Sequence, residues 1–117
     1  KTRCPAVFGS LNSLKDAYEV FKRYSTSMLT KAKAQFLALL FNVASGRAFE
    51  SDLVAVYLYK ALRSKYPSLG VSDYPLTLRA VISVSCNNIV GLRNLEFTKN
   101  ICETLNTGYS CYVLVSP

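Results

Sequence analysis

The four cysteines constrain this chain more than any other feature of its 117 residues. Cys4, Cys86, Cys102 and Cys111 are widely spaced, and the sequence has neither a C-x-x-C pair nor a histidine. Structural zinc sites use closely spaced cysteine and histidine ligands, so we expect no bound metal. An even number of thiols predicts two disulfides instead, and disulfides persist in oxidising compartments. The expected location is therefore secreted or on a cell surface.

Length and composition predict a single domain over residues 1–117, because a chain of this length buries a proper core. The net charge of +7 comes entirely from residues 1–66, where eleven lysines and arginines face four acids. Half of the residues are hydrophobic, which favours some apolar surface for a partner. The longest apolar run, residues 34–44, is too short to cross a bilayer, so the chain is not expected to be transmembrane.

The first half of the sequence has helical spacing. Apolar residues recur with a helical period after Ser13, which predicts a first helix. A second helix is expected from Ser27 to Gly46, because glycine commonly ends a helix. A third is expected from about residue 51 until Pro67 stops it.

The second half changes to alternating spacing. From Leu76 to Cys86 every second residue is apolar, apart from one extra valine, which predicts a strand with Cys86 on its buried face. A helix with Leu95 and Leu105 on its apolar side follows, and residues 109–115 form a closing strand. Neighbouring strands joined through a helix run parallel. The predicted fold class is α+β, with an N-terminal three-helix half packed on a small sheet that contains a C-terminal strand–helix–strand unit.

This unit also predicts how the cysteines pair. Cys102, late in the helix, and Cys111, early in the closing strand, are expected at one end, and Cys86 at the other. We therefore predict the bridges Cys102–Cys111 and Cys4–Cys86. Two alternatives stay open, namely four free thiols buried as small hydrophobic side chains, and an intracellular hyperthermophile protein in which disulfides also persist.

The expected second helix carries a spaced set of small and polar residues: Ala34, Gln35, Ala38, Asn42, Val43, Ala44 and Gly46. This set resembles an A-x-Q-x-x-A-x-x-x-N-V-A-x-G run in helical domains of extracellular bacterial surface proteins, and the resemblance covers residues 31–46. The resemblance implies an exported surface or matrix protein without known catalysis. The same segment is apolar on nearly all sides, which is typical of a central, covered helix.

The sequence offers little to catalysis. Without histidine, a nucleophilic cysteine lacks its usual activating base. Glu50 and Asp52 are close together, but both lie where a helix N-terminus favours negative charge, which explains them as capping residues. The five glycines are dispersed, so they form no phosphate-binding loop. We predict that the protein is not an enzyme and holds no cofactor.

Two sets of residues are candidates for binding. The uncharged terminal strand is the expected interface, through Tyr109, Tyr112 and Leu114, because an edge strand with unpaired backbone groups accepts a strand from a neighbour. A central strand buried on both faces explains the same residues and stays open as an alternative. The second set is basic and interleaved with tyrosines, and it is the candidate anion-binding site: Lys22, Arg23, Lys60, Arg63 and Lys65.

We therefore expect a structural or adhesive protein that acts through protein–protein contacts, with a homo-oligomer or filament as one form. The alternative is a small basic secreted effector or toxin that binds an anionic membrane or nucleic acid. Nucleic acid or an anionic surface is the less favoured partner, because basic charge alone is a weak signal.

Overall fold

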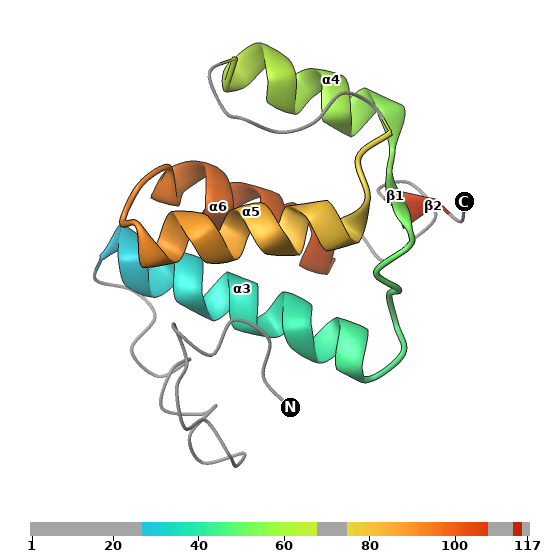
Figure 1. The fold of residues 1–117 in the computed structure, drawn as a ribbon, viewed down its shortest axis with the longest axis horizontal. Helices are drawn as coiled ribbons and strands as arrows, with labels where there is room; N and C mark the ends of the chain where they lie inside the picture. The colour runs from blue at the N-terminus through green and yellow to red at the C-terminus, as the bar shows by residue number, and fades with distance from the viewer. Residues whose placement is uncertain (1–26, 68–74, 108–113, 116–117) are drawn as a thin grey trace.

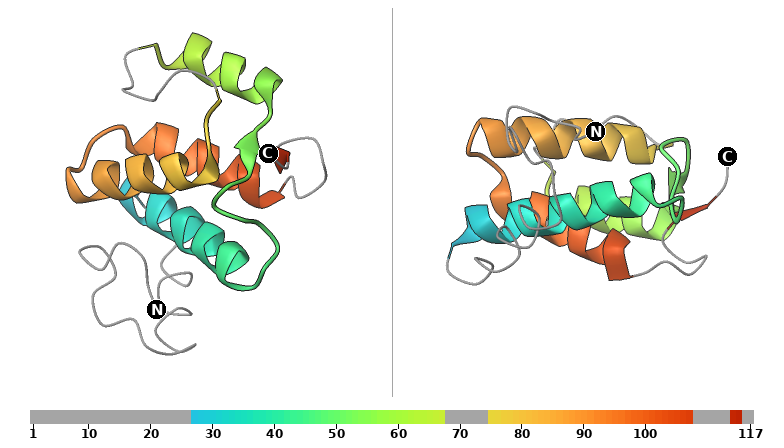
Figure 2. Two further views of the ribbon diagram at one scale, coloured as in Figure 1. Left: turned by 45° about the vertical axis from the view of Figure 1, so that its right-hand side comes forward. Right: turned by 90° about the horizontal axis from the view of Figure 1, so that it is seen from below.

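The structure, a computed structural model, describes residues 27–67, 75–107 and 114–115, which are mostly helical. Its elements are α3 (Met28–Ala44), β1 (Leu53–Val54), α4 (Val56–Lys65), α5 (Leu78–Val90), α6 (Leu95–Thr107) and β2 (Leu114–Val115). Figure 1 shows α5 and α6 between α3 below and α4 above. Figure 2 shows from two further directions that α3, α5 and α6 form the central bundle.

The central helix α3 confirms the helix expected from Ser27 to Gly46. The Ser27 side chain accepts a hydrogen bond from the Thr30 amide at 3.1 Å, which caps the first turn. Gly46 adopts a φ of +81° after the last turn, a conformation that glycine takes without steric cost. The helix buries a row of apolar side chains: Ala32, Ala34, Phe36, Leu37, Leu39 and Leu40.

The α3–α6 pair is the most extensive contact between described helices, and a polar cluster joins the two helices. The Asn42 side-chain amide donates to Asn106 Oδ1 at 2.9 Å, and Asn106 Nδ2 donates in turn to the Gln35 carbonyl at 2.9 Å. Gln35 and Asn42 belong to the set that resembles bacterial surface domains. In this chain, their side chains help to hold α3 against α6.

The expected strand from Leu76 to Cys86 is wrong, because residues 78–90 form helix α5. Thr77 caps this helix by accepting a hydrogen bond from the Ala80 amide at 3.1 Å. The buried residues follow helical spacing: Leu78, Val81, Ile82, Ser85, Asn88 and Ile89. The β-branched residues raise the local strand propensity, but a helix brings this row onto the core.

The predicted α+β fold is therefore wrong. The only sheet in the described part of the chain is the antiparallel pair β1–β2, two residues in each strand. Its β2 belongs to the expected closing strand, but it pairs with Leu53–Val54 and not with a parallel neighbour. Helix α6 is confirmed and buries Ile101 and Leu105 on its inner side. The described fold is a helical bundle with a short strand pair at one end.

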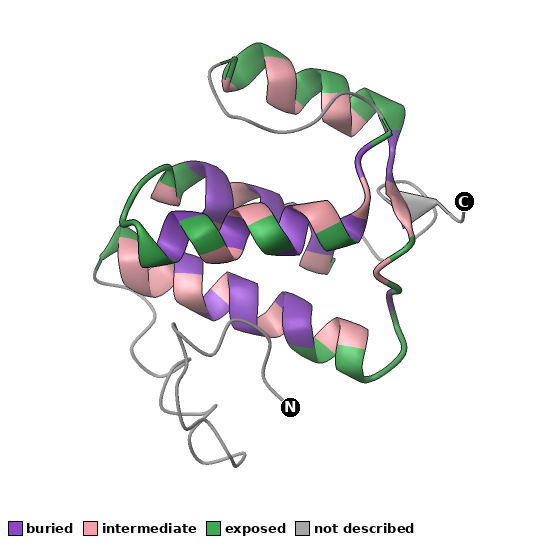
Figure 3. Ribbon diagram, viewed as in Figure 1, coloured by how far each residue is buried: buried purple, intermediate pink, exposed green. Residues whose placement is uncertain are grey.

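Helix α4 begins later than expected, at Val56, because Leu53 and Val54 are paired in β1. None of its residues is fully buried, and Figure 3 shows a helix of half-buried and exposed residues only. Its inner side packs partly on the core through Leu58, Leu62 and Tyr66. The Tyr66 ring meets Phe97 edge to face at 5.1 Å, and Asn100 donates to the Tyr66 hydroxyl at 3.0 Å. These contacts attach α4 by one side.

The turn between α5 and α6 contains a leucine in a backbone conformation that favours glycine. Leu92 has a φ of +54° and is 65% exposed. The Arg93 amide donates to the Asn88 carbonyl at 2.9 Å, and the Leu92 amide to the Ile89 carbonyl at 3.2 Å. This pattern is a Schellman cap in which Leu92 occupies the position usually taken by glycine.

Candidate interaction site

The cysteines do not pair as expected. Cys102 carries a free thiol that is fully buried in α6, 3.7 Å from the Ser85 hydroxyl, so the predicted Cys102–Cys111 bridge is wrong. No disulfide joins two of the described residues. Cys86, on α5, is disulfide-bonded, whereas Cys4 and Cys111 lie outside the described residues. The prediction of two bridges is therefore wrong.

Burial also determines the chemistry of the Cys102 thiol. Loss of solvation raises the pKa of this thiol to about 12, and the hydrogen bond with Ser85 offsets part of that effect. Cys102 is therefore protonated at neutral pH. A buried, protonated thiol is a poor nucleophile, so Cys102 serves as a small core side chain.

The described residues contain no group of three or more cysteine or acidic side chains that could hold a metal ion. Of the four acids in those residues, Glu50 lies 3.4 Å from Arg79, Glu103 lies 2.7 Å from Lys99, and Asp52 accepts from the Phe49 amide at 3.0 Å. These three carboxylates therefore already contact an arginine, a lysine or a backbone amide. None of the described helices is long and apolar enough to cross a bilayer.

A cleft of about 490 Å³ separates α4 from α6. Its walls carry small, hydroxyl and charged side chains: Ala61, Leu62, Lys65, Tyr66, Asn100, Glu103, Thr104 and Thr107. The Thr104 and Thr107 hydroxyls donate to carbonyls of their own helix, and Glu103 is paired with Lys99. The cleft brings together no nucleophile with an activating base.

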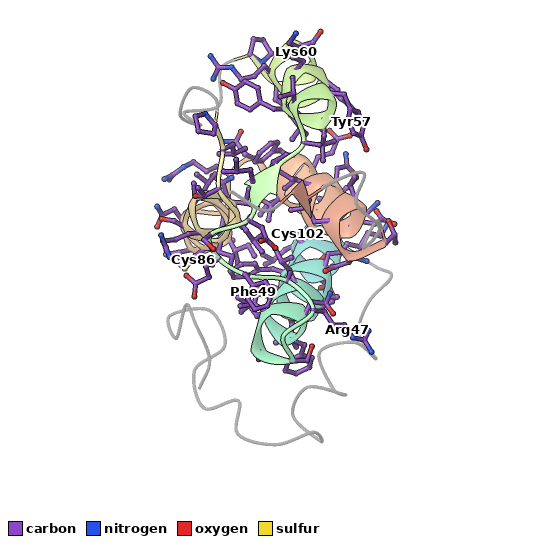
Figure 4. All side chains as sticks on the ribbon, turned by 90° about the vertical axis from the view of Figure 1, so that its right-hand side faces the viewer. Arg47, Phe49, Tyr57, Lys60, Cys86 and Cys102 are labelled. Carbon is purple, nitrogen blue, oxygen red and sulfur yellow. The ribbon has the colours of Figure 1, made fainter. Side chains whose placement is uncertain are left out.

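Of the five predicted anion-binding residues, the structure describes three, and all three lie on α4. Lys60 and Lys65 are exposed on α4, Arg63 is half-buried on the same helix, and Lys22 and Arg23 lie outside the described residues. The exposed residues of α4 fall on one side of the helix, which we call the α4 outer face: Val56, Tyr57, Lys60, Ala61, Ser64 and Lys65. Figure 4 shows Tyr57 and Lys60 pointing away from the bundle.

Of the predicted interface residues, the structure describes only Leu114, while Tyr109 and Tyr112 lie outside the described part. Leu114 lies in β2 opposite Val54, and Val115 lies opposite Leu53. On the other side of β1, the Val54 amide donates to the Leu76 carbonyl at 2.8 Å, and Leu53 forms a bridge with Thr77. Strand β1 is therefore covered on both edges.

This pairing determines which way the backbone of β2 points. Because the Val54 amide points toward Leu76, the backbone groups of Leu53 point the opposite way, toward β2. Leu53 and Val115 are then the hydrogen-bonded pair of the ladder. Val54 and Leu114 are the non-hydrogen-bonded pair. It follows that the amide and carbonyl of Leu114 point outward, where no described residue pairs with them.

Sequence reasoning missed one exposed aromatic residue, Phe49, whereas Tyr57 belongs to the tyrosines interleaved with the basic set. Phe49 is 60% exposed in the turn before β1, and Tyr57 is 58% exposed at the start of α4. Both lie on the side of the molecule that faces the viewer in Figure 4. No local pattern marks Phe49 as exposed, because its exposure depends on how the turn before β1 meets the bundle.

The chain matches no protein-family model, no curated protein and no solved structure. The candidate site is therefore defined by the geometry of this chain alone. It consists of the outward edge of β2, the exposed Phe49 beside it, and the α4 outer face.

Proposed function

We propose that this chain is a non-catalytic structural protein that acts through protein–protein contacts, and that its first partner is a second copy of itself. The observation that supports this most directly is the outward direction of the Leu114 amide and carbonyl at the edge of the β1–β2 pair. Unpaired backbone groups at an edge strand are a template for another strand. An exported location belongs to the proposal, because it is what the resemblance of residues 31–46 implies.

Two-fold symmetry suits this edge. In an isologous contact the same residue of each copy faces its equivalent, so the outward groups of Leu114 in one copy would meet those in the other. The outward amide and carbonyl of Leu114, which pair with no described residue, would then be paired in both copies, and the two strand pairs would join into one four-stranded antiparallel sheet.

Charge also favours the edge over other surfaces. The chain carries a net charge of +7, so two copies repel each other wherever their basic residues meet. The strand residues Leu53, Val54, Leu114 and Val115 carry no charge. The exposed Phe49 ring adds apolar area on the same side. Copies meeting at this edge would bury apolar surface without bringing lysines together.

Light scattering coupled to size exclusion tests the proposal. We expect the mass of the wild type to rise with protein concentration, and to rise more at about 500 mM than at about 50 mM NaCl, because salt screens repulsion between like charges. Leu114→Pro removes the outward amide, and Phe49→Ser removes exposed apolar area, so each should lower the mass. Leu92→Ser is the matched control, since Leu92 is equally apolar and exposed but lies in the α5–α6 turn.

Two results would contradict the proposal. One is a wild type that remains monomeric at every concentration and salt level. The other is a Leu92→Ser variant that loses association as fully as Phe49→Ser does, since association would then follow general surface hydrophobicity and not the edge.

A further inference from the structure

Helix α4 packs on the bundle through its half-buried side, and its other side is exposed, although Ala61 and Lys65 on that side also border the cleft with α6. Every residue of the α4 outer face is exposed, while the positions between them are half-buried. The exposed set falls into two rows along the helix, Val56–Lys60–Ser64 and Tyr57–Ala61–Lys65, with members of each row four residues apart. The outer face is therefore a continuous strip over the whole length of α4.

The charge on this face comes from two lysines, Lys60 and Lys65. Helix α4 contains no acidic residue. In the described part of the chain, the ion-paired carboxylates Glu50 and Glu103 face Arg79 and Lys99, which belong to other helices. The α4 outer face thus presents two lysines that form no ion pair with a described residue, and the Lys65 ammonium lies 5.4 Å over the Tyr66 ring.

The shape of the face suits a protein segment. Ala61 lies in the middle of one row and Ser64 at the end of the other, and both are small, so the backbone of a partner can approach closely there. Tyr57 and Val56 stand at one end as apolar anchors, 58% and 45% exposed, and tyrosine is enriched among the residues that dominate binding energy. The face therefore combines an apolar end with two lysines along the rest of its length.

Other anionic partners fit less well. Two exposed lysines neutralise few phosphates, whereas proteins that bind nucleic acid through charge neutralise several. A helix that lies in a membrane surface needs a wide apolar face, and here only Val56 and Tyr57 supply large apolar side chains.

From this combination we infer that the α4 outer face docks an acidic, partly apolar segment of a partner protein. Carboxylates of the segment pair with Lys60 and Lys65, and its apolar residues cover Tyr57 and Val56. Complementary charge steers such a partner and selects against basic ones, which include a second copy of this face. This inference concerns a surface and a partner different from those of self-association at the β2 edge, so it does not depend on that contact.

The test uses two synthetic helical peptides of about 20 residues, long enough to present several turns. One has leucine on one side and glutamate elsewhere, and the other has glutamine in place of each glutamate. Binding is followed by fluorescence anisotropy of the labelled peptides at low protein concentration. We expect the wild type to bind the glutamate peptide at least about tenfold more tightly than the glutamine peptide at about 50 mM NaCl, and less so at higher salt.

Variants locate the site. Lys60→Glu with Lys65→Glu should weaken the glutamate peptide at least about tenfold, and Tyr57→Ala should weaken both peptides about fivefold or more. The matched control is Arg47→Glu with Arg93→Glu, which changes the net charge equally at two exposed residues outside α4. It should cost less than about threefold, because its charges lie away from the binding face.

Four results would overturn the inference. They are an absence of binding to the glutamate peptide, equal affinity for the glutamine peptide, an equal loss in the control variant, and tighter binding to a short DNA duplex or to phosphatidylglycerol vesicles.

Should the double charge reversal fail to fold, Lys60→Gln with Lys65→Gln gives the same comparison. The two peptides also test the inference with the wild type alone. Equal affinity for the two peptides would mean that the face does not select acidic partners, which contradicts the inference. Self-association is measured without either peptide, so the two proposals fail separately.

Discussion

Replacing Phe36 or Phe41 by alanine separates the buried from the exposed side of α3. Both residues lie on the same helix, but Phe36 is fully buried, whereas Phe41 is 41% exposed. Truncating a buried phenylalanine costs about 3–5 kcal/mol, because it removes apolar burial and leaves a cavity. Phe41 has less burial to lose, and its site opens to solvent. About three fifths of a full burial energy of about 1.5–3 kcal/mol gives a cost of about 1–2 kcal/mol.

These energies translate into distinct melting temperatures. An unfolding entropy of about 2.1 cal/mol/K per residue gives about 0.25 kcal/mol/K for a chain of 117 residues. Each kcal/mol then shifts the Tm by about 4 °C, so we expect Phe36→Ala to lower it by about 12–20 °C and Phe41→Ala by about 4–8 °C. Circular dichroism melts, checked by urea unfolding, measure both. A Phe36→Ala variant that melts within a few degrees of the wild type, or no lower than Phe41→Ala, would refute the described core.

Two further predictions concern the buried thiol and the strained turn. Burial raises the pKa of the Cys102 thiol above its value in the unfolded chain. The protonated thiol therefore contributes fully to the free energy of unfolding below about pH 8.5, and this contribution is lost as the pH rises toward 12. Urea unfolding between about pH 8 and pH 11 should therefore show a steeper loss of stability in the wild type than in Cys102→Ala, and parallel curves would contradict the burial. Leu92→Gly relieves the strain of a leucine with positive φ but gives the unfolded chain more conformational freedom. We expect the relief to be larger and the Tm to rise by about 2–4 °C. A fall in the Tm would show that the exposed leucine stabilises the monomer.

The sequence predicted two of the described helices well because each carries its own local signals. Ser27 and Gly46 mark the two ends of α3, and the apolar spacing from Leu95 to Leu105 marks α6. These signals act within a few residues and do not depend on the rest of the fold. The polar contacts of Asn106 with α3, by contrast, join residues far apart in sequence, and no local pattern reveals them.

Helix α5 was mistaken for a strand because its residues satisfy two periods at once. Leu78 and Ile82 are apolar in both the alternating and the helical pattern, and Val81 and Ile89 belong only to the helical one. The Thr77 cap was the deciding local signal. The predicted disulfide pairing depended on this strand and is wrong for the same reason. Cys102 contacts Ser85 of α5 in the core and does not lie at the end of a sheet.

The positions of the candidate binding residues could be predicted only in part. Leu114 was expected to present open backbone groups, and the bonds of β1 with Leu76 explain why the groups of Leu114 point outward. Lys60, Arg63 and Lys65 were expected to bind anions, and all three lie on α4, where Arg63 is half-buried and the two lysines are exposed. The exposure of Phe49 depends on how its turn meets the bundle, which the sequence does not reveal.

The measurement that tests the central claim most directly is amide hydrogen exchange of Leu114 and Val115, followed by NMR as a function of protein concentration. The Val115 amide points toward β1 and should be protected at every concentration, whereas the Leu114 amide points outward and should gain protection only as copies associate. Contradictory results would be a Leu114 amide that exchanges at one unchanging rate over the whole concentration range, or one already protected in the dilute monomer.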